Sequence, residues 1–380
     1  MAEMTTPPAR FGLAQAIPFW VSLLLPLVAA AGAILGGYWV LLVPVCTWYL
    51  FSIIDSFAGL DEDNEDPSTD DAQLFWYKAI TMIWAPVQFI TLFGILAYVS
   101  WTDHLGTWDT IGIMFGVGVI TGTIGINYSH ELLHQRPKIE VWMADLLLAM
   151  VMYSHFRSEH VLVHHRYVAT PRDPVTARYN MGFHRFFPRV IWACYISAWG
   201  AEKTVLRRKN KPWYDRANPF WRYWALQLVF ITLAFAIGGW VGVGLFFFQA
   251  LVAIWQLELV NYIEHYGLTR KHLGKGKYEY VQPRHSWNAS YKVSNWLLIN
   301  LQRHSDHHFK ADRRFPLLQS YDETEAPQLP HGYPLMTMLA MVPPLWRRVM
   351  NPRVRAWRQR FYPEIEDWAP YNEGSTDWPR

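Results

Sequence analysis

The sequence predicts an all-α, polytopic membrane protein in which about six transmembrane helices carry a histidine-rich helical cap on their cytoplasmic side. Hydrophobic residues make up 52% of the 380 residues and charged residues only 17%, whereas soluble proteins have about 25% charged residues. Several uncharged runs are long enough to cross a bilayer, since one helix needs about 20 residues. The net charge of +3 is too small to indicate a nucleic-acid partner.

The first four spans follow from three uncharged stretches. Residues 11–54 contain no Lys, Arg, Asp or Glu and can hold two spans divided at Gly36–Gly37. A cleavable signal peptide explains the first span less well, because its basic start is weak and a second span follows at once. After the acidic loop DEDNEDPSTDDA come uncharged runs at 79–101 and 110–129, and glycines in the second of these predict close helix contacts.

The last two spans come from residues 223–257, an uncharged stretch with Gly238–Gly239 in its middle. Residues 141–154 are apolar but too short to span and include Asp145, so we expect a buried or re-entrant helix there. The six expected spans are approximately 15–36, 38–58, 79–101, 109–133, 220–238 and 240–265.

Lys and Arg are concentrated in residues 134–219 and 266–380, whereas the connections at the opposite ends of the spans contain none. Because basic segments stay in the cytoplasm, we expect both termini and a cap formed by these two segments on that side. No internal repeat or second core is evident, so residues 1–380 are expected to form one integral-membrane domain. Cys46 and Cys194 offer no disulfide framework or thiolate metal site.

Nine of the 15 histidines cluster near the predicted cytoplasmic ends of the spans. They are His130 and His134 in HELLH, His160, His164 and His165 in EHVLVHH, His265 in NYIEHYG, and His304, His307 and His308 in LQRHSDHH. Helical residues at i, i+3 and i+4 share one face. The first pair, the last three, and His160 with His164 could therefore each converge on one point. His165 lies about 100° around the helix from His164 and could reach a neighbouring point.

The string HELLH matches the H-E-x-x-H pattern of zinc peptidases. A catalytic zinc takes about three protein ligands, so nine imidazoles are too many for one such site. They suit two metals, each with open positions, and imidazole sets suit iron, copper or zinc alike. Glu131 then loses the general-base role of the motif and becomes an outer or structural residue.

At these histidines the sequence resembles the integral-membrane alkane 1-monooxygenases, a branch of the membrane fatty-acid desaturase/hydroxylase superfamily. The strings NYIEHYGL and LQRHSDHH are specific to the alkane hydroxylase branch and its relatives. The second histidine motif (histidine box), at His160–His165, is H-x-x-x-H-H here, whereas a membrane desaturase usually has H-x-x-H-H at this position. The resemblance runs from the first span to about Tyr321, although FKADRRFPLL after the last box departs from the family pattern.

The resemblance implies a non-haem di-iron centre held by the nine histidines, in a protein of the bacterial inner membrane. It implies terminal hydroxylation of medium- or long-chain n-alkanes with O2, and electrons from rubredoxin, which a rubredoxin reductase reduces with NAD(P)H. Rubredoxin holds iron with four cysteines in two pairs, which this chain lacks. The donor is therefore expected on a separate chain or in a fused portion outside this sequence.

Two further sets of residues are candidates for supporting roles. Metal-bound histidines usually donate their second N–H to an acceptor, and the acceptor candidates are Glu159, Glu258, Asn261, Glu264 and Asp306. Ordinary solvation at the membrane surface is the alternative for these carboxylates. A basic surface could dock an acidic electron carrier, and the candidates are Arg207, Arg208, Lys209 and Lys211. Contact with anionic lipid explains these cations equally well.

Three other functions are weighed against alkane hydroxylation. Within the superfamily, a fatty-acyl desaturase or an aryl-methyl hydroxylase of the xylene type would use the same histidines. An intramembrane zinc protease would use His130, Glu131 and His134 and would not need His307. A metal transporter would place ligands near the middle of the bilayer, whereas these histidines are expected at one face.

Overall fold

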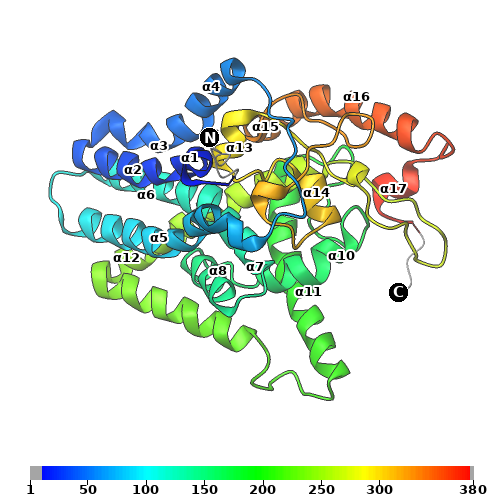
Figure 1. Ribbon diagram of the computed structural model, residues 1–380. Coiled ribbons are helices and arrows are strands. Elements are labelled where there is room, and N and C mark those ends of the chain that lie inside the picture. Colours follow the sequence, from blue (N-terminus) through cyan, green and yellow to red (C-terminus); the bar gives the residue numbers. More distant parts are fainter. Residues whose placement is uncertain (1–10, 377–380) are drawn as a thin grey trace, which may run out of the picture.

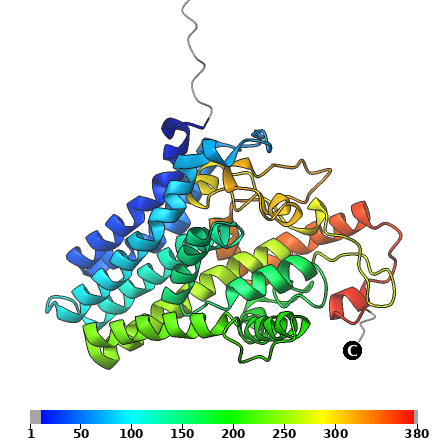
Figure 2. The ribbon, with the colours of Figure 1, turned by 60° about the horizontal axis from the view of Figure 1, so that its bottom comes forward.

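The computed structural model describes residues 11–376, and this part of the chain consists of helices and loops with isolated β-bridges but no strand. The long apolar helices lie side by side at one end of the molecule, while shorter helices and loops form the other end (Figure 1; Figure 2). The all-α class is confirmed, and the protein is an integral membrane protein.

Five helical segments in the described residues are long and apolar enough to cross a membrane. The first, Leu13–Leu35, contains α1 (Leu13–Ala16), η1 (Ile17–Leu23) and α2 (Leu24–Leu35). The second, Gly37–Ala58, contains η2 (Gly37–Leu41), α3 (Leu42–Pro44), η3 (Val45–Leu50) and α4 (Phe51–Ala58). The third, Asp71–Trp101, contains η4 (Asp71–Leu74) and α5 (Phe75–Trp101). The fourth, Thr107–Leu133, contains α6 (Thr107–Ile120), η5 (Thr121–Ile126) and α7 (Asn127–Leu133), and the fifth is α12 (Phe220–His265).

The third segment begins at Asp71 rather than at residue 79. Asp70 caps its first turn, because its Oδ1 accepts the backbone N–H of Ala72 at 3.0 Å. The helical segment therefore starts within the acidic loop, before the uncharged run at residues 79–101 that predicts this span.

The fifth segment is a helical hairpin, so it accounts for two of the six expected spans. Gly238 (φ −132°, ψ 17°) and Gly239 (φ 59°, ψ −147°) leave the helical conformation, and the positive φ of Gly239 is one that glycine tolerates readily. The two arms touch beyond this break: a Cβ atom on Gly242 would lie 2.5 Å from the carbonyl oxygen of Ala234. Residues eight apart in a straight helix would be separated by about 12 Å, so the chain reverses at the glycine pair.

The glycine-rich fourth segment packs tightly against α12, as its composition predicts. A Cβ atom on Gly118 would lie 2.6 Å from Cβ of Val252, and one on Gly122 would lie 2.7 Å from the carbonyl oxygen of Ala253. Thr121 donates to Gln249 Oε1 at 3.0 Å across the same contact. Small residues and a buried hydrogen bond thus fix the two helices that carry histidines at their ends.

The cap is made from two stretches of short helices on either side of α12. Before α12 it contains α8 (Lys138–Met150), α9 (Phe156–Glu159), η6 (His160–His164), α10 (His165–Tyr167) and α11 (Phe183–Arg208). After α12 it contains η7 (Pro283–His285), α13 (Lys292–Leu297), α14 (His304–Phe309), η8 (Phe315–Leu317), α15 (Tyr333–Ala340), α16 (Pro343–Phe361) and α17 (Ala369–Glu373). The expected short buried helix is α8, where Leu147, Leu148 and Ala149 are inaccessible to solvent.

The acidic loop closes over the cap beside the last histidine box. Arg303, which is buried, donates to the carbonyl oxygens of Asp61 and Asp63 at 3.2 and 3.0 Å, and to that of Leu318 at 2.7 Å. These contacts fix the start of α14, the helix that presents His304, His307 and His308.

Candidate metal centre

The structure gathers all nine predicted histidines into two neighbouring groups. The five-histidine group consists of His130, His134, His160, His165 and His307. The four-histidine group consists of His164, His265, His304 and His308. Within each group the ring nitrogens that face one another all lie within 4.8 Å. Elements far apart in the sequence therefore bring one imidazole set to each of two points.

The expected pairing of His160 with His164 is wrong, and the cause is a π-helical turn. Residues His160–His164 form this turn, in which the His165 N–H bonds to the carbonyl oxygen of His160. The wider i→i+5 turn aligns residues five apart, so His160 joins His165 and His164 points to the other group. In EHVLVHH, four residues separate His160 from His165, and the widened helical turn places these two histidines on the same face.

The last box is also divided, contrary to the expectation of one shared point. His304 and His308, one α-helical turn apart, belong to the four-histidine group, whereas His307 belongs to the five-histidine group. Helix α14 therefore lies between the two points and serves both. His130 and His134 share a group, as their spacing on one helical face predicts.

The imidazoles converge through their Nε2 atoms. In the five-histidine group, His160 Nε2 lies 3.0 Å from that of His134 and 2.9 Å from that of His165. In the four-histidine group, His304 Nε2 lies 3.1 Å from that of His265 and 3.0 Å from that of His308. Two nitrogens on opposite sides of one ion, each bound at about 2.1 Å, are separated by about 4.2 Å. The two clusters therefore have the size and donor chemistry of transition-metal sites.

Burial disfavours the protonated form of several of these histidines, and the neutral form is the one that binds metal. Burial lowers the pKa of His134 to about 3. Burial, reinforced by neighbouring imidazoles, lowers the pKa values of His160, His307 and His308 well below their usual range. The Nε2 of His164 is buried without a hydrogen-bond partner. Such a nitrogen is costly unless a metal ion or another donor satisfies it.

Two carboxylates contact the outward Nδ1 atoms, and both belong to the four-histidine group. Asp173 Oδ2 lies 3.0 Å from His164 Nδ1, and Glu264 Oε1 lies 3.3 Å from His304 Nδ1. Burial alone would raise the pKa of Asp173, but hydrogen bonds from His164 Nδ1 and the Thr176 hydroxyl help to hold it below its usual value. The hydrogen bond to Asp173 places the proton of His164 on Nδ1 and turns its Nε2 toward the other imidazoles, whereas Glu264 only lies close to His304 Nδ1.

Sequence reasoning identified Glu264 but missed Asp173. The Asp173–Pro174 pair signals a turn, yet nothing local shows that this turn folds back on His164. Thr176 completes the geometry, since its hydroxyl donates to Asp173 Oδ2 at 2.6 Å. In the sequence, the available signals are this turn and the position of Asp173, eight residues after His165.

The remaining acceptor candidates make no hydrogen bond to a histidine within the described chain. Glu258 accepts from the Tyr153 hydroxyl at 2.9 Å and from Asn261 Nδ2 at 3.1 Å, which explains how a carboxyl group is accommodated in a membrane-spanning helix. Asp306 instead accepts from Arg313 at 2.5 Å and from the Tyr321 hydroxyl at 2.8 Å. Burial, with Asp173 and Glu258 nearby, raises the pKa of Glu159 well above its usual range.

Glu131 of the H-E-x-x-H string also has a structural position. Its Oε1 accepts from the backbone N–H of Phe315 and from Gln135 Nε2, both at 3.4 Å. The carboxylate therefore supports the turn at η8, which agrees with the loss of the general-base role expected for this residue.

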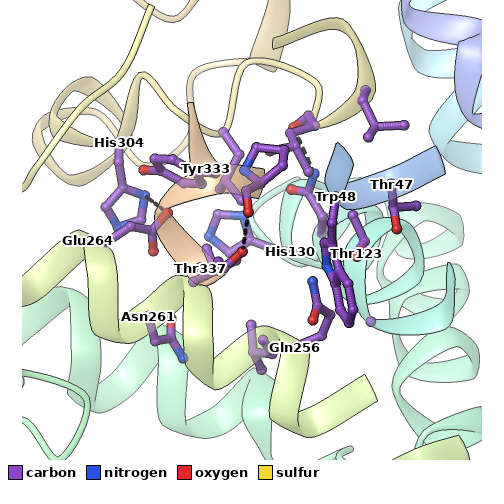
Figure 3. Close-up of a pocket in the computed structure, with 18 of the residues that line it drawn as sticks. Thr47, Trp48, Thr123, His130, Gln256, Asn261, Glu264, His304, Tyr333 and Thr337 are labelled. Atoms are coloured by element: carbon purple, nitrogen blue, oxygen red, sulfur yellow. Dashed lines mark hydrogen bonds and ion pairs between the residues drawn. The ribbon is translucent and has the colours of Figure 1, made fainter. Parts of the chain in front are cut away.

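A cavity lies against both histidine groups. It reaches His130 and His160 of the five-histidine group and His304 of the four-histidine group. Gln256, Val260 and Glu264, successive turns on one face of α12, form one wall. Figure 3 shows Glu264 and His304 on one side of the cavity and Trp48, from the π-helical turn η3, on the other. Most of the surface that it exposes is apolar, as a site for a hydrocarbon requires.

The proposed docking cations lie apart from the cavity lining, at the C-terminal end of α11. Arg207, Arg208 and Lys209 are exposed, whereas Lys211 pairs with Asp215 at 3.1 Å. Trp213 and Tyr214, which follow directly, are exposed as well.

Comparison with known proteins agrees with this arrangement. Residues 107–340 match the fatty acid desaturase family. The chain is 38% identical over 352 residues to alkane 1-monooxygenase 2 of Alcanivorax borkumensis, covering 90% of each chain. It is 38% identical to alkane 1-monooxygenase 2 of Pseudomonas aeruginosa, covering 84% of this chain and 85% of the relative. It is 28% identical to the xylene/toluene monooxygenase hydroxylase component of Pseudomonas putida, covering 94% and 95%. The chain therefore belongs to the alkane 1-monooxygenase family of membrane enzymes, within the fatty acid desaturase superfamily.

Proposed function

We propose that the protein hydroxylates the terminal carbon of medium- or long-chain n-alkanes at a di-iron centre. In this reaction R–CH3, O2, two electrons and two protons give R–CH2OH and water. The observation that carries the proposal is a largely apolar cavity walled by histidines from two adjacent all-imidazole groups. The alkane 1-monooxygenase relatives support the same substrate class.

The five-histidine group would hold one iron and the four-histidine group the other. Zinc is redox-inactive, whereas this reaction consumes two electrons, and imidazole ligands suit iron. When bound, the iron pair supplies activation of O2 and accepts the electrons. The bacterial inner membrane, with both termini and the cap in the cytoplasm, is the proposed location, and the whole chain is proposed to act as one domain.

The protein chain positions the substrate, excludes water from the cavity and holds the histidine ligands in a form that can bind metal. Burial disfavours protonation of several imidazoles, a hydrogen bond to Asp173 holds His164 at Nδ1, and Glu264 lies beside His304 Nδ1. The apolar walls exclude water and hold a chain that offers no hydrogen bond or charge, so its end carbon is placed by shape alone. Trp48 is the largest side chain on the wall opposite Glu264, and it packs edge-on against Phe115 and Trp255, which holds that wall in place.

The proposed electron donor is rubredoxin, reduced by rubredoxin reductase with NAD(P)H. Its docking surface is assigned to α16, where exposed arginines occur without any Asp or Glu. They are Arg347, Arg348, Arg353, Arg355 and Arg360. The same helix contacts the residue that follows a histidine of the four-histidine group, since Asn351 accepts from the Tyr266 hydroxyl at 2.7 Å and Tyr266 follows His265. Replacing Arg348 and Arg353 by Gln should raise the KM for rubredoxin and leave kcat nearly unchanged, since rim charges act mainly on association.

The deciding experiment uses the iron-loaded protein in nanodiscs with rubredoxin, its reductase and NADH. We expect n-octane to give 1-octanol that carries one atom of isotopically labelled O2. A new double bond in an octanoyl thioester, without 1-octanol, would establish desaturation instead. Faster hydroxylation of p-xylene than of octane would favour the aryl-methyl activity of the Pseudomonas putida relative. Zinc in place of iron, with activity surviving His307→Ala, would overturn the di-iron proposal.

A further inference from the structure

A groove with about 1170 Å³ of empty space lies beside the C-terminal end of α11, among residues outside the metal centre. Leu133, Val161 and Leu206 contribute apolar walls, while Lys209 and Arg216 belong to the same lining. Lys209 and Arg216 are exposed and form no ion pair with any described residue. The groove thus combines a largely polar lining, which includes two unpaired cations, with apolar side chains on part of its wall.

The groove lies at the membrane boundary. Leu133 is the last residue of the fourth membrane segment, and Arg222 and Tyr223, which also line the groove, are near the start of the fifth. Lipid headgroups are therefore the groups expected at this level, with acyl chains on the membrane side.

The charge of the groove favours an anion. Four cations contribute to it, and two of them, Arg157 and Arg222, share the single carboxylate of Asp145 at 3.1 and 2.7 Å. Glu202 is the other carboxylate, and its Oε1 accepts from the Ser158 hydroxyl at 2.6 Å. The four cations, Arg157, Lys209, Arg216 and Arg222, therefore exceed the two carboxylates by two charges.

Helix α11 has the features of an interfacial helix. It runs across the direction of α5 and α12 in Figure 1, and Figure 2 looks nearly along it while α12 lies across the view. Trp192 is 69% exposed, and Tyr195 and Ile196, at i+3 and i+4, are exposed on the same face. Such a helix, with an apolar aromatic face and a basic end, lies in the plane of the membrane surface.

Exposed aromatic side chains occur on the chain segments that line the groove and on α8, which contacts its lining residue Arg222. They are Trp142, Trp213, Tyr214, Trp221 and Trp224. Trp and Tyr concentrate at the headgroup level of membranes, and Arg222 lies 4.9 Å above the ring of Trp142. A docking surface for a soluble carrier would not need this belt, and α16 has no comparable belt.

We propose that this groove binds the phosphate headgroup of an anionic phospholipid, with Lys209 and Arg216 contacting the phosphate and the apolar walls contacting an acyl chain. The cations at the end of α11 then belong to a lipid site that anchors α11, and the electron carrier docks elsewhere. Lipid binding requires neither iron nor turnover, so this proposal stands or falls independently of the hydroxylation reaction.

The test titrates the detergent-solubilised protein with dioctanoyl phosphatidylglycerol and with dioctanoyl phosphatidylcholine, and measures bound lipid by native mass spectrometry. We expect wild-type protein to bind the anionic lipid at least tenfold more tightly. Lys209→Gln combined with Arg216→Gln should weaken that affinity roughly 30-fold, since each basic residue near a lipid surface contributes about 1 kcal/mol. Affinity for phosphatidylcholine should not change.

Two matched variants control for loss of fold and for general charge. Lys209→Arg with Arg216→Lys should retain phosphatidylglycerol binding, and Arg348→Gln with Arg353→Gln on α16 should also retain it. Equal affinity for the two lipids, or an equal loss in the α16 variant, would overturn the proposal. Inorganic phosphate that competes fully with the lipid would show a site for free anions only. A raised KM for rubredoxin with unchanged lipid affinity in the Lys209/Arg216 variant would show a carrier site instead.

Discussion

The two histidine groups lie side by side yet differ in what surrounds them. The four-histidine group has a carboxylate at the Nδ1 of His164 and another at that of His304. Within residues 11–376, no carboxylate forms an ion pair or hydrogen bond with a histidine of the five-histidine group. The five-histidine group has one more histidine, and it contributes His130 and His160 to the cavity wall. The four-histidine group contributes only His304.

This difference makes the two proposed metal positions chemically unequal. A carboxylate at Nδ1 makes the imidazole a stronger ligand and adds negative charge close to the metal. The four-histidine group thus has one ligand fewer, but Asp173 forms a hydrogen bond to one of its imidazoles and Glu264 lies next to another. The five-histidine group relies on imidazoles alone and has the larger share of the substrate cavity.

The largest expected effect comes from removing one ligand from each group. His307 and His308 are neighbours on α14 but belong to different groups, so alanine at either position changes the same helix by the same amount. Both variants should lose hydroxylation. His308→Ala leaves three imidazoles and should lose the iron of its group, whereas His307→Ala leaves four and should retain most of its iron.

Iron content by mass spectrometry and Mössbauer spectra of the purified variants measure this difference. His155→Phe is the matched control, because His155 is buried but belongs to neither group, and this variant should keep both irons. Equal iron loss in the His307 and His308 variants would contradict the assigned partition.

The second effect tests the carboxylate support. Asp173→Asn keeps an acceptor for His164 Nδ1 but removes the charge, so we expect iron affinity of the four-histidine group to fall about 10- to 100-fold. Iron retained during dialysis against a chelator gives the measurement. Asp306→Asn is the control: Asp306 is equally buried but is held by Arg313 and Tyr321. That variant should unfold at a lower temperature without losing iron affinity. Similar iron loss in both variants would remove Asp173 from its assigned role.

Much of this architecture follows from one-dimensional patterns. Uncharged runs of known length predict the spans, and the glycine pair at 238–239 predicts the hairpin, because a membrane helix must be apolar and a reversal favours glycine. The nine histidines stand out for the same reason: imidazoles at helical spacing near the membrane face serve few purposes other than metal binding.

The partition of the histidines could not be predicted in this way. Helical spacing assumes about 100° for each residue, and the π-helical turn at His160–His164 changes that angle for one box only. Asp173 escaped prediction because its contact with His164 depends on how a loop folds back. Both cases depend on tertiary structure that overrides a regular local geometry.

The smallest effect concerns buried histidines outside the two groups, which show what burial alone does to an imidazole. Burial lowers the pKa of His155 to about 3 and that of His285 to about 4, although Glu279 opposes the second shift. An unfolded histidine has a pKa of about 6.5. Below that pH the histidine is protonated in the unfolded chain but stays neutral in the folded protein. The free energy of unfolding therefore decreases as the pH falls toward the lowered pKa of the folded state.

His155→Phe removes one such proton-linked group without touching a ligand. Between about pH 6.5 and pH 5, the iron-loaded variant should lose about 1.6 kcal/mol less stability than the wild type does, since a full proton contributes about 1.36 kcal/mol per pH unit and the unfolded histidine is half protonated at about pH 6.5. Thermal unfolding of both proteins across this range measures the difference in slope. The histidines of the two groups should not contribute in the loaded protein, because bound metal occupies the nitrogen that would take the proton. Parallel pH profiles for wild type and His155→Phe would show that His155 does not contribute to the acid sensitivity.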